Sequence, residues 1–293
     1  MRYAFGRLAP EPVDDPGGPV AYELIAFDMD GTLLDSRKEV LPSSVDAIAR
    51  AAAAGKTVAI SSGRCPKMIS MYRQKLPGVR YAICCSGAIV YDLEQGRILT
   101  ERAIPTDVVA RSIRTADEEG TYILEVTAGE GIYMEKREID MAPECGVAVY
   151  QQLYMDTSEL VEDAHAVALD PAARVPKLNF HFADPATRDR THARLADADV
   201  TIADCEISSL EFTCAGVDKG TGIAELAGIL GIDVSQTIAV GDAMNDLAML
   251  RAAGLGAAMG NAIPEAVAAA DVQVADNDHG GCAEAIDRFL LGE

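Results

Sequence analysis

Four aspartates in this sequence form two close pairs, and each pair follows a short apolar run. Asp28 and Asp30 come directly after Leu24–Phe27, and Asp242 and Asp246 lie beside the end of a second run. Carboxylates that meet at one point suit a hard cation, and a carboxylate that is left free can attack an electrophile. Metal binding and nucleophilic chemistry are therefore the first hypotheses.

Two further clusters offer groups that bind phosphate oxygens. Ser62, Gly63 and Arg64 follow the apolar run Val58–Ile60, and Lys219 stands at the start of a helical pattern. A hydroxyl and an ammonium group suit the oxygens of a phosphoryl group. Each cluster alone has an ordinary explanation, because aspartate often caps a helix, Ser-Gly is a common turn and a lone lysine is usually solvated. Four such clusters in one chain favour a shared phosphate site.

The elements that must position these clusters alternate between strands and helices. Short apolar runs alternate with helical patterns over residues 24–84 and again over residues 221–290. This order predicts an α/β fold with a doubly wound parallel sheet, and ligands bind beyond the carboxyl ends of such strands. Ser43 is expected to cap the first helix in a capping box with Asp46, and a second helix is expected over residues 66–76.

The middle of the chain has a different pattern. Residues 103–212 contain two or more predicted strands for each helix, which predicts a mixed α+β domain inserted into the α/β domain. The core domain then consists of residues 22–102 and residues 213–293. Residues 1–21 are rich in Pro, Gly and Asp and are expected to form a flexible extension.

Composition limits the partners. The 293-residue chain carries a formal net charge of −21 at pH 7, which disfavours nucleic acid and anionic lipid. No apolar run approaches the roughly 20 residues of a membrane span, and the N-terminus has no apolar signal region. The cysteines are scattered, so reduced thiols in a cytoplasmic protein are expected. An anionic small molecule would need positive charge from a metal or from a few Lys and Arg residues.

Four stretches have the spacing of known motifs. D-x-D-G-T-L matches Asp28–Leu33, and an apolar strand ending in S-G-R matches Ser62–Arg64. A lysine motif, G-x-x-K-G, matches Gly216–Gly220, and G-D-x-x-N-D matches Gly241–Asp246. In this order they resemble the haloacid dehalogenase-like superfamily, in particular its Cof-type sugar-phosphatase branch, over about residues 23–290. The resemblance implies a Rossmann-like core and a large inserted cap.

The resemblance also implies roles for the matching residues. Asp28 would be the nucleophile that forms an aspartyl-phosphate, and Asp30 would be the general acid and then the general base. Mg²⁺ would be held by Asp28, the main-chain carbonyl of Asp30 and Asp242. Ser62 and Lys219 would hold the phosphoryl oxygens, where charge lies in the transition state.

The remaining motif residues receive less direct roles. Gly63 belongs to the same phosphate-binding turn as the preceding serine. Arg64 is expected either to contact phosphate at the rim or to form a structural ion pair. Asn245 would orient the substrate or the motif lysine, and Asp246 would lie behind the site, where it steers water or that lysine.

The function implied is a Mg²⁺-dependent phosphatase that hydrolyses a small phosphorylated metabolite, such as a sugar phosphate. The inserted cap would close over the substrate and exclude water. Two other functions stay open, namely a phosphotransferase or phosphomutase on the same core and a non-catalytic phosphate-binding protein. One departure from the branch is Ser86, which stands where asparagine is usual. Its place at the rim of the site bears on substrate preference.

Overall fold

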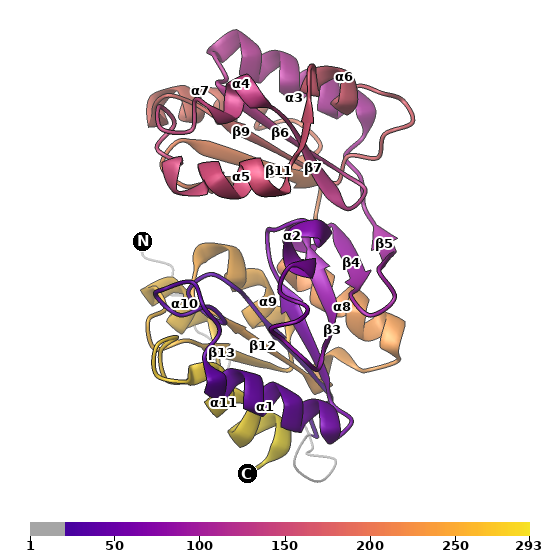
Figure 1. The fold of residues 1–293 in the computed structure, drawn as a ribbon, viewed down its shortest axis with the longest axis vertical. Helices are drawn as coiled ribbons and strands as arrows, with labels where there is room; N and C mark the ends of the chain where they lie inside the picture. The colour runs from indigo at the N-terminus through magenta and orange to yellow at the C-terminus, as the bar shows by residue number, and fades with distance from the viewer. Residues whose placement is uncertain (1–20) are drawn as a thin grey trace, which may run out of the picture.

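The structure is a computed structural model that describes residues 21–293, so residues 1–20 of the predicted extension 1–21 lie outside the described residues. Two bodies are stacked along the long axis of the molecule, and each is built around its own sheet (Figure 1). The lower sheet uses strands from both ends of the described chain, whereas the upper sheet uses strands from its middle.

The lower body contains an eight-stranded sheet in the order β14-β13-β12-β1-β2-β3-β4-β5. Neighbours from β14 to β3 pair in parallel, and β4 and β5 form an antiparallel hairpin at one edge. The chain runs outward in opposite directions from β1 and β12, so the strand order reverses between these two strands. The strands are β1 (Leu24–Phe27), β2 (Thr57–Ser61), β3 (Val79–Cys84), β4 (Ile89–Asp92), β5 (Arg97–Glu101), β12 (Thr237–Gly241), β13 (Leu255–Ala258) and β14 (Val272–Gln273).

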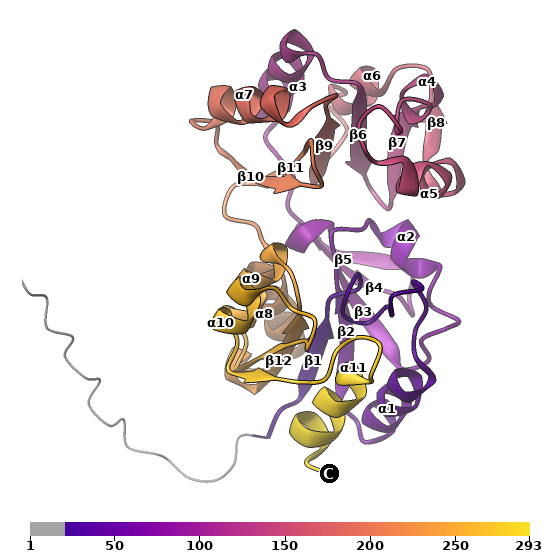
Figure 2. The same cartoon turned by 90° about the vertical axis from the view of Figure 1, so that its left-hand side faces the viewer.

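Helices cover both faces of this sheet (Figure 2). In β1, Ile25 and Phe27 pack into the apolar cluster of one face, and Leu24 and Ala26 pack into that of the other. This arrangement confirms the doubly wound α/β fold, because successive side chains of a central strand are buried on opposite faces. The helices are α1 (Pro42–Ala53) and α11 (Gly281–Ala285) on the first face, and α8 (Lys219–Leu230), α9 (Leu247–Ala252) and α10 (Pro264–Ala269) on the second.

Two local predictions were wrong. Helix α1 begins with Pro42 and has no side-chain cap, so Ser43 and Asp46 do not form the expected capping box. Proline suits the first helical position because its missing N–H would have no partner there. Helix α2 starts as expected but ends at Ser70, because tighter turns with hydrogen bonds to the third preceding residue replace the helix before Leu76.

The upper body contains a six-stranded sheet in the order β10-β11-β9-β6-β7-β8, antiparallel except for the pair β7 and β8. Helices α3, α6 and α7 cover the face turned away from the lower body (Figure 2). The strands are β6 (Ile123–Ala128), β7 (Gly131–Glu135), β8 (Glu159–Val161), β9 (Lys177–His181), β10 (Val200–Cys205) and β11 (Ser209–Cys214). The helices are α3 (Thr106–Glu119), α4 (Lys136–Ile139), α5 (Gln151–Thr157), α6 (Ala164–Ala168) and α7 (Pro185–Leu195).

The upper sheet lies within the predicted insertion, apart from the end of its last strand. Strand β11 runs to Cys214, two residues beyond residue 212, where the sequence places the end of the cap. The division into 22–102, 103–212 and 213–293 stays a prediction, and "cap" and "core" below mean the upper and lower bodies. Among the helices of residues 21–293, none combines the length and the apolar character needed to cross a bilayer.

Candidate active site

The motif residues converge because the strands that carry them are neighbours. Strand β1 pairs in parallel with β12 on one side and with β2 on the other, so the carboxyl ends of all three meet. Asp28 directly follows β1, and its N–H donates to the carbonyl of Val240 in β12 at 2.9 Å. Ser62 follows β2, and Asp242 follows β12. The side chains therefore meet at the switch point of the sheet, where open α/β folds bind their ligands.

Lys219 contacts two of the aspartates, Asp28 and Asp246. It is the first residue of α8, and its side chain is fully buried. Its Nζ donates to Oδ1 of Asp28 at 2.5 Å and to Oδ1 of Asp246 at 2.7 Å. Within residues 21–293 the second carboxylate oxygen of Asp28 has no hydrogen-bond partner. The contact positions Asp28 and leaves one of its oxygens available.

Burial and charge set the pKa values of this group. Burial raises the pKa of Asp28 to about 7, although the Lys219 ammonium opposes the rise, and the nearby carboxylates of Asp246 and Asp242 add to it. For Lys219, burial acts to lower the pKa, but the two carboxylates that it contacts outweigh burial and hold it above its ordinary value. The lysine is therefore a permanent cation at this site.

Asp246 organises the loop after β12. Its Oδ2 accepts the main-chain N–H groups of Asp242 and Ala243, both at 2.9 Å, while its Oδ1 accepts from Lys219. Both carboxylate oxygens are thus engaged, and the side chain is fully buried. This geometry places Asp246 behind the site, in contact with the lysine that the sequence analysis expected it to steer.

Asp242 lies against the turn that follows Asp28. Its Oδ1 accepts the hydroxyl of Thr32 at 2.7 Å. Gly31 adopts φ +86°, and a Cβ at this position would lie 2.4 Å from Oδ2 of Asp242, so the turn requires glycine. Burial raises the pKa of Asp242 as well, with a further rise from the carboxylate of Asp246.

These carboxylates form a donor set that fits a hard cation. Oxygens of Asp28, Asp242 and Asp246 all lie within 4.8 Å of one another. Since both oxygens of Asp246 already accept hydrogen bonds, Asp28 and Asp242 offer the oxygens that could hold an ion. Asp28 is buried and Asp242 is half-buried, and both have raised pKa values. A divalent cation between these two carboxylates would favour their ionised forms.

Asp30 has a different environment. Its carboxylate accepts two hydrogen bonds from Arg64, at 2.8 and 3.0 Å, and one from Lys38 at 2.8 Å. Burial acts to raise the pKa of Asp30, but the charges of Arg64 and Lys38 and their hydrogen bonds lower it overall. Of the two roles considered for Arg64, the structure contains the ion pair, supported by a hydrogen bond to the hydroxyl of Tyr72 at 3.2 Å. Lys38 was missed, because a lysine in a polar loop carries no sequence signal of such a contact.

A cavity of about 280 Å³ opens in front of this group. Its core side is lined by six predicted residues: Asp28, Asp30, Ser62, Gly63, Arg64 and Asn245. The other three predicted residues, Lys219, Asp242 and Asp246, do not line it. The Oγ of Ser62 accepts the N–H of Arg64 at 3.3 Å, and Asn245 is exposed on the cavity wall.

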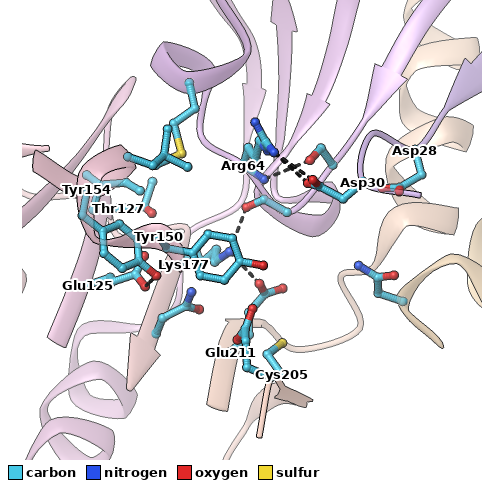
Figure 3. A pocket seen from close by; sticks show the side chains of 18 of the residues that line it. Asp28, Asp30, Arg64, Glu125, Thr127, Tyr150, Tyr154, Lys177, Cys205 and Glu211 are labelled. Atoms are coloured by element: carbon cyan, nitrogen blue, oxygen red, sulfur yellow. Dashed lines mark hydrogen bonds and ion pairs between the residues drawn. The ribbon is translucent and has the colours of Figure 1, made fainter. Parts of the chain in front are cut away.

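The cap supplies the opposite wall of the cavity. Glu125, Thr127, Lys177 and Glu211 point into the same space as the core carboxylates (Figure 3). Lys177 bridges the two bodies, since its Nζ donates to the carbonyl of Gly63 at 2.7 Å and lies 2.5 Å from an oxygen of Glu211. None of these cap residues was predicted from the sequence. The available signal was the alternation of polar and apolar residues over 177–182. This alternation predicts a strand with one polar face, but it does not show which part of the protein lies opposite that face.

Comparison with known proteins agrees with this geometry. A model of the haloacid dehalogenase-like hydrolases matches residues 25–286, so the chain belongs to this family. The putative phosphatase YxeH of Bacillus subtilis (strain 168) is 28% identical over 280 residues, which cover 93% of this chain and 100% of that protein. The pyridoxal phosphate phosphatase YbhA of Escherichia coli (strain K12) is 28% identical over 281 residues, which cover 92% of this chain and 98% of that protein.

Similar solved structures belong to the same class of protein. A haloacid dehalogenase-like hydrolase from Bacteroides thetaiotaomicron has a TM-score of 0.78 at 26% identity, covering 91% of this chain and 99% of that one. A haloacid dehalogenase-like hydrolase from B. subtilis has a TM-score of 0.79 at 26% identity, covering 92% of this chain and 100% of that one. Family membership and the names of the relatives together support assignment of the chain as a phosphomonoesterase.

Proposed function

We propose that the chain is a Mg²⁺-dependent phosphatase that hydrolyses a small phosphorylated metabolite, such as a sugar phosphate, through an aspartyl-phosphate on Asp28. The observation that carries the proposal is the contact of the buried Lys219 with one oxygen of Asp28, which leaves the other oxygen available at the cavity. A cation fixed beside the nucleophile is suited to the negative charge that develops on a phosphoryl group.

In the first step, the available oxygen of Asp28 attacks phosphorus and the bond from phosphorus to the leaving oxygen breaks. Asp30 donates its proton to that oxygen, so the product leaves as an alcohol. A dianionic phosphate near Arg64 and Lys38 competes for the two cations that lower the pKa of Asp30. Substrate binding thereby favours the protonated form that this step requires.

In the second step, Asp30 removes a proton from water, and the water oxygen attacks phosphorus of the aspartyl-phosphate. The bond to Asp28 breaks, which restores its carboxylate and releases phosphate. Lys219 holds Asp28 in place through both steps. Asp28 and Asp242, with the main-chain carbonyl of Asp30, would hold Mg²⁺, which supplies charge neutralisation between the anionic nucleophile and the anionic phosphate.

The size of the cavity and its two walls support a compact substrate. The proposal is tested by measuring free phosphate released from a panel of phosphorylated metabolites, with Mg²⁺ and with EDTA. The panel includes sugar phosphates and pyridoxal phosphate, for which one relative is named. Asp28→Asn serves as the inactive control. Phosphoryl transfer to a second sugar without release of free phosphate would overturn the hydrolase assignment.

A further inference from the structure

The face of the cap sheet that looks toward the core is polar across its central strands. Glu125 in β6 pairs in register with Asn179 in β9, which pairs on its other side with Glu211 in β11. These three side chains therefore lie side by side in one row across the sheet. Lys177 precedes the row by two residues of β9 and lies on the same face. All four line the cavity in front of Asp28.

Several acceptor oxygens on this face have no partner among the described residues. Glu125 accepts the hydroxyl of Tyr154 at 2.7 Å and contacts Nε2 of His181 at 2.5 Å, both through Oε1, so that Oε2 has no partner within residues 21–293. The Oδ1 of Asn179 is buried and has no hydrogen-bond partner among the described residues. A buried acceptor without a partner is unfavourable and would gain from a ligand that donates to it.

Glu206 adds a second available carboxylate. It lies in the turn between β10 and β11, with φ 43°, and it lines the cavity. No hydrogen bond or ion pair to its side chain is present within the part of the chain that the structure describes. The main cation of the cap wall, Lys177, is already engaged by Glu211 and by the carbonyl of Gly63.

We propose that this wall selects the leaving group, and that the preferred substrate is a phosphate monoester with a leaving group rich in hydroxyl or ammonium donors and without a second anionic group. Glu125, Asn179 and Glu206 are the specificity-determining residues. Donors of the leaving group pair with their free oxygens, whereas a carboxylate or a second phosphate would face Glu125 and Glu206 across the cavity. The inference rests on the proposed phosphatase function.

The first test compares substrates that differ mainly in one anionic group. Glucose 6-phosphate is compared with 6-phosphogluconate, and fructose 6-phosphate with fructose 1,6-bisphosphate, each by kcat/KM for phosphate release. The member of each pair without the additional anionic group is expected to be better by about tenfold or more, since like charges that face each other at a binding site are strongly unfavourable. Equal values, or a preference for the anionic member, would overturn the inference.

p-Nitrophenyl phosphate separates this inference from the phosphatase function itself, because its leaving group has no hydroxyl or ammonium donors. If wild type but not Asp28→Asn hydrolyses it, the proposed function holds. If in that case Glu206→Lys lowers kcat/KM for the hydroxyl-rich esters no more than for p-nitrophenyl phosphate, the inference about the cap wall is wrong. If wild type hydrolyses neither this ester nor the metabolites, the proposed function fails.

The second test reverses a charge on the wall. Glu206→Lys at the exposed turn is expected to shift the ratio of kcat/KM for 6-phosphogluconate over glucose 6-phosphate upward by about tenfold, with a smaller shift in the same direction for Glu206→Gln. Glu162→Lys makes the same change of net charge at an exposed cap residue outside the cavity and is expected to leave the ratio unchanged. An unaltered ratio in Glu206→Lys, with both substrates slowed alike, would indicate a merely structural role and refute the assignment.

Discussion

Replacing Lys219 by methionine would leave two buried carboxylates without their cation. The lysine side chain is fully buried and lies within 2.7 Å of both Asp28 and Asp246. Methionine is unbranched and has a similar length, so the change removes the charge with little change of shape. Breaking a buried ion pair by removing one partner typically lowers the free energy of unfolding by roughly 3–5 kcal/mol. We expect a loss of this size for Lys219→Met at pH 8 without metal.

The loss is expected to shrink as the pH falls. Burial already raises the pKa of Asp28 to about 7 against the pull of Lys219, and removal of the lysine raises it further. In the unfolded chain this carboxyl has an ordinary pKa near 4. Between pH 8 and pH 5 the folded variant therefore takes up protons that the unfolded chain does not, and this uptake stabilises the folded form. A neutral Asp28 carboxyl no longer needs the cation, so the difference between the variant and the wild type is expected to be smaller at pH 5.

Urea unfolding followed by circular dichroism, in EDTA at pH 5 and pH 8, measures both effects. Lys67→Met is a matched control, because Lys67 pairs with Glu159 at 2.7 Å across the two bodies but is exposed. Its loss is expected to stay within about 1 kcal/mol at either pH. A Lys219→Met loss that is equal at pH 5 and pH 8, or no larger than that of the control, would refute the reasoning about the buried carboxylates.

Four further outcomes are expected. EDTA should abolish phosphate release and added Mg²⁺ should restore it in a colorimetric assay, whereas full activity after chelation would contradict the metal role. Gly31→Ala should weaken Mg²⁺ binding in thermal-shift titrations, because the new Cβ would lie 2.4 Å from Oδ2 of Asp242. Ser62→Ala should lower kcat/KM by about tenfold through loss of a hydrogen bond to phosphate, and an unchanged value would contradict its role. Asp30→Asn should slow hydrolysis of alkyl phosphates by about 10²–10⁴ but p-nitrophenyl phosphate far less, and rapid mixing should show a burst of nitrophenol. Equal slowing of both esters without a burst would contradict acid–base action by Asp30.

The core could be predicted because its signals are local in the sequence. A fully buried strand such as β1 reads as a short apolar run, and the chemical groups follow directly where the strand ends. Parallel pairing then brings distant motifs together, and the pairing of β1 with β12 places Asp28 close to Asp242. Contacts formed by loops were not predictable in this way. Lys38 meets Asp30 through the conformation of a polar loop, and neither composition nor periodicity reports that conformation.

The wall of the cap was harder to predict for a further reason. Alternation in β9 shows that Lys177 and Asn179 share a face, but only the packing of cap against core decides what that face meets. The opposite face is fixed by apolar side chains such as Phe180 and Phe212, which pack beneath α3 and α7. A shift of one residue in β11 would turn Phe212 toward the cavity and bury Glu211 in the apolar cluster.

The register that aligns the acceptors is therefore stabilised by the apolar face, not by the acceptors themselves. Substitutions on the cavity face can change which leaving group fits without changing the apolar cluster that holds the sheet together. Substrate specificity is most independent of the stability of the sheet at Glu206. This residue lies in a turn, is exposed and has no side-chain partner within residues 21–293. Specificity and stability are least independent at Glu125, which is buried and already accepts from Tyr154, so its replacement would also leave a buried hydroxyl without its acceptor. A change of specificity is for this reason easier to obtain at the turn than within the row of the sheet.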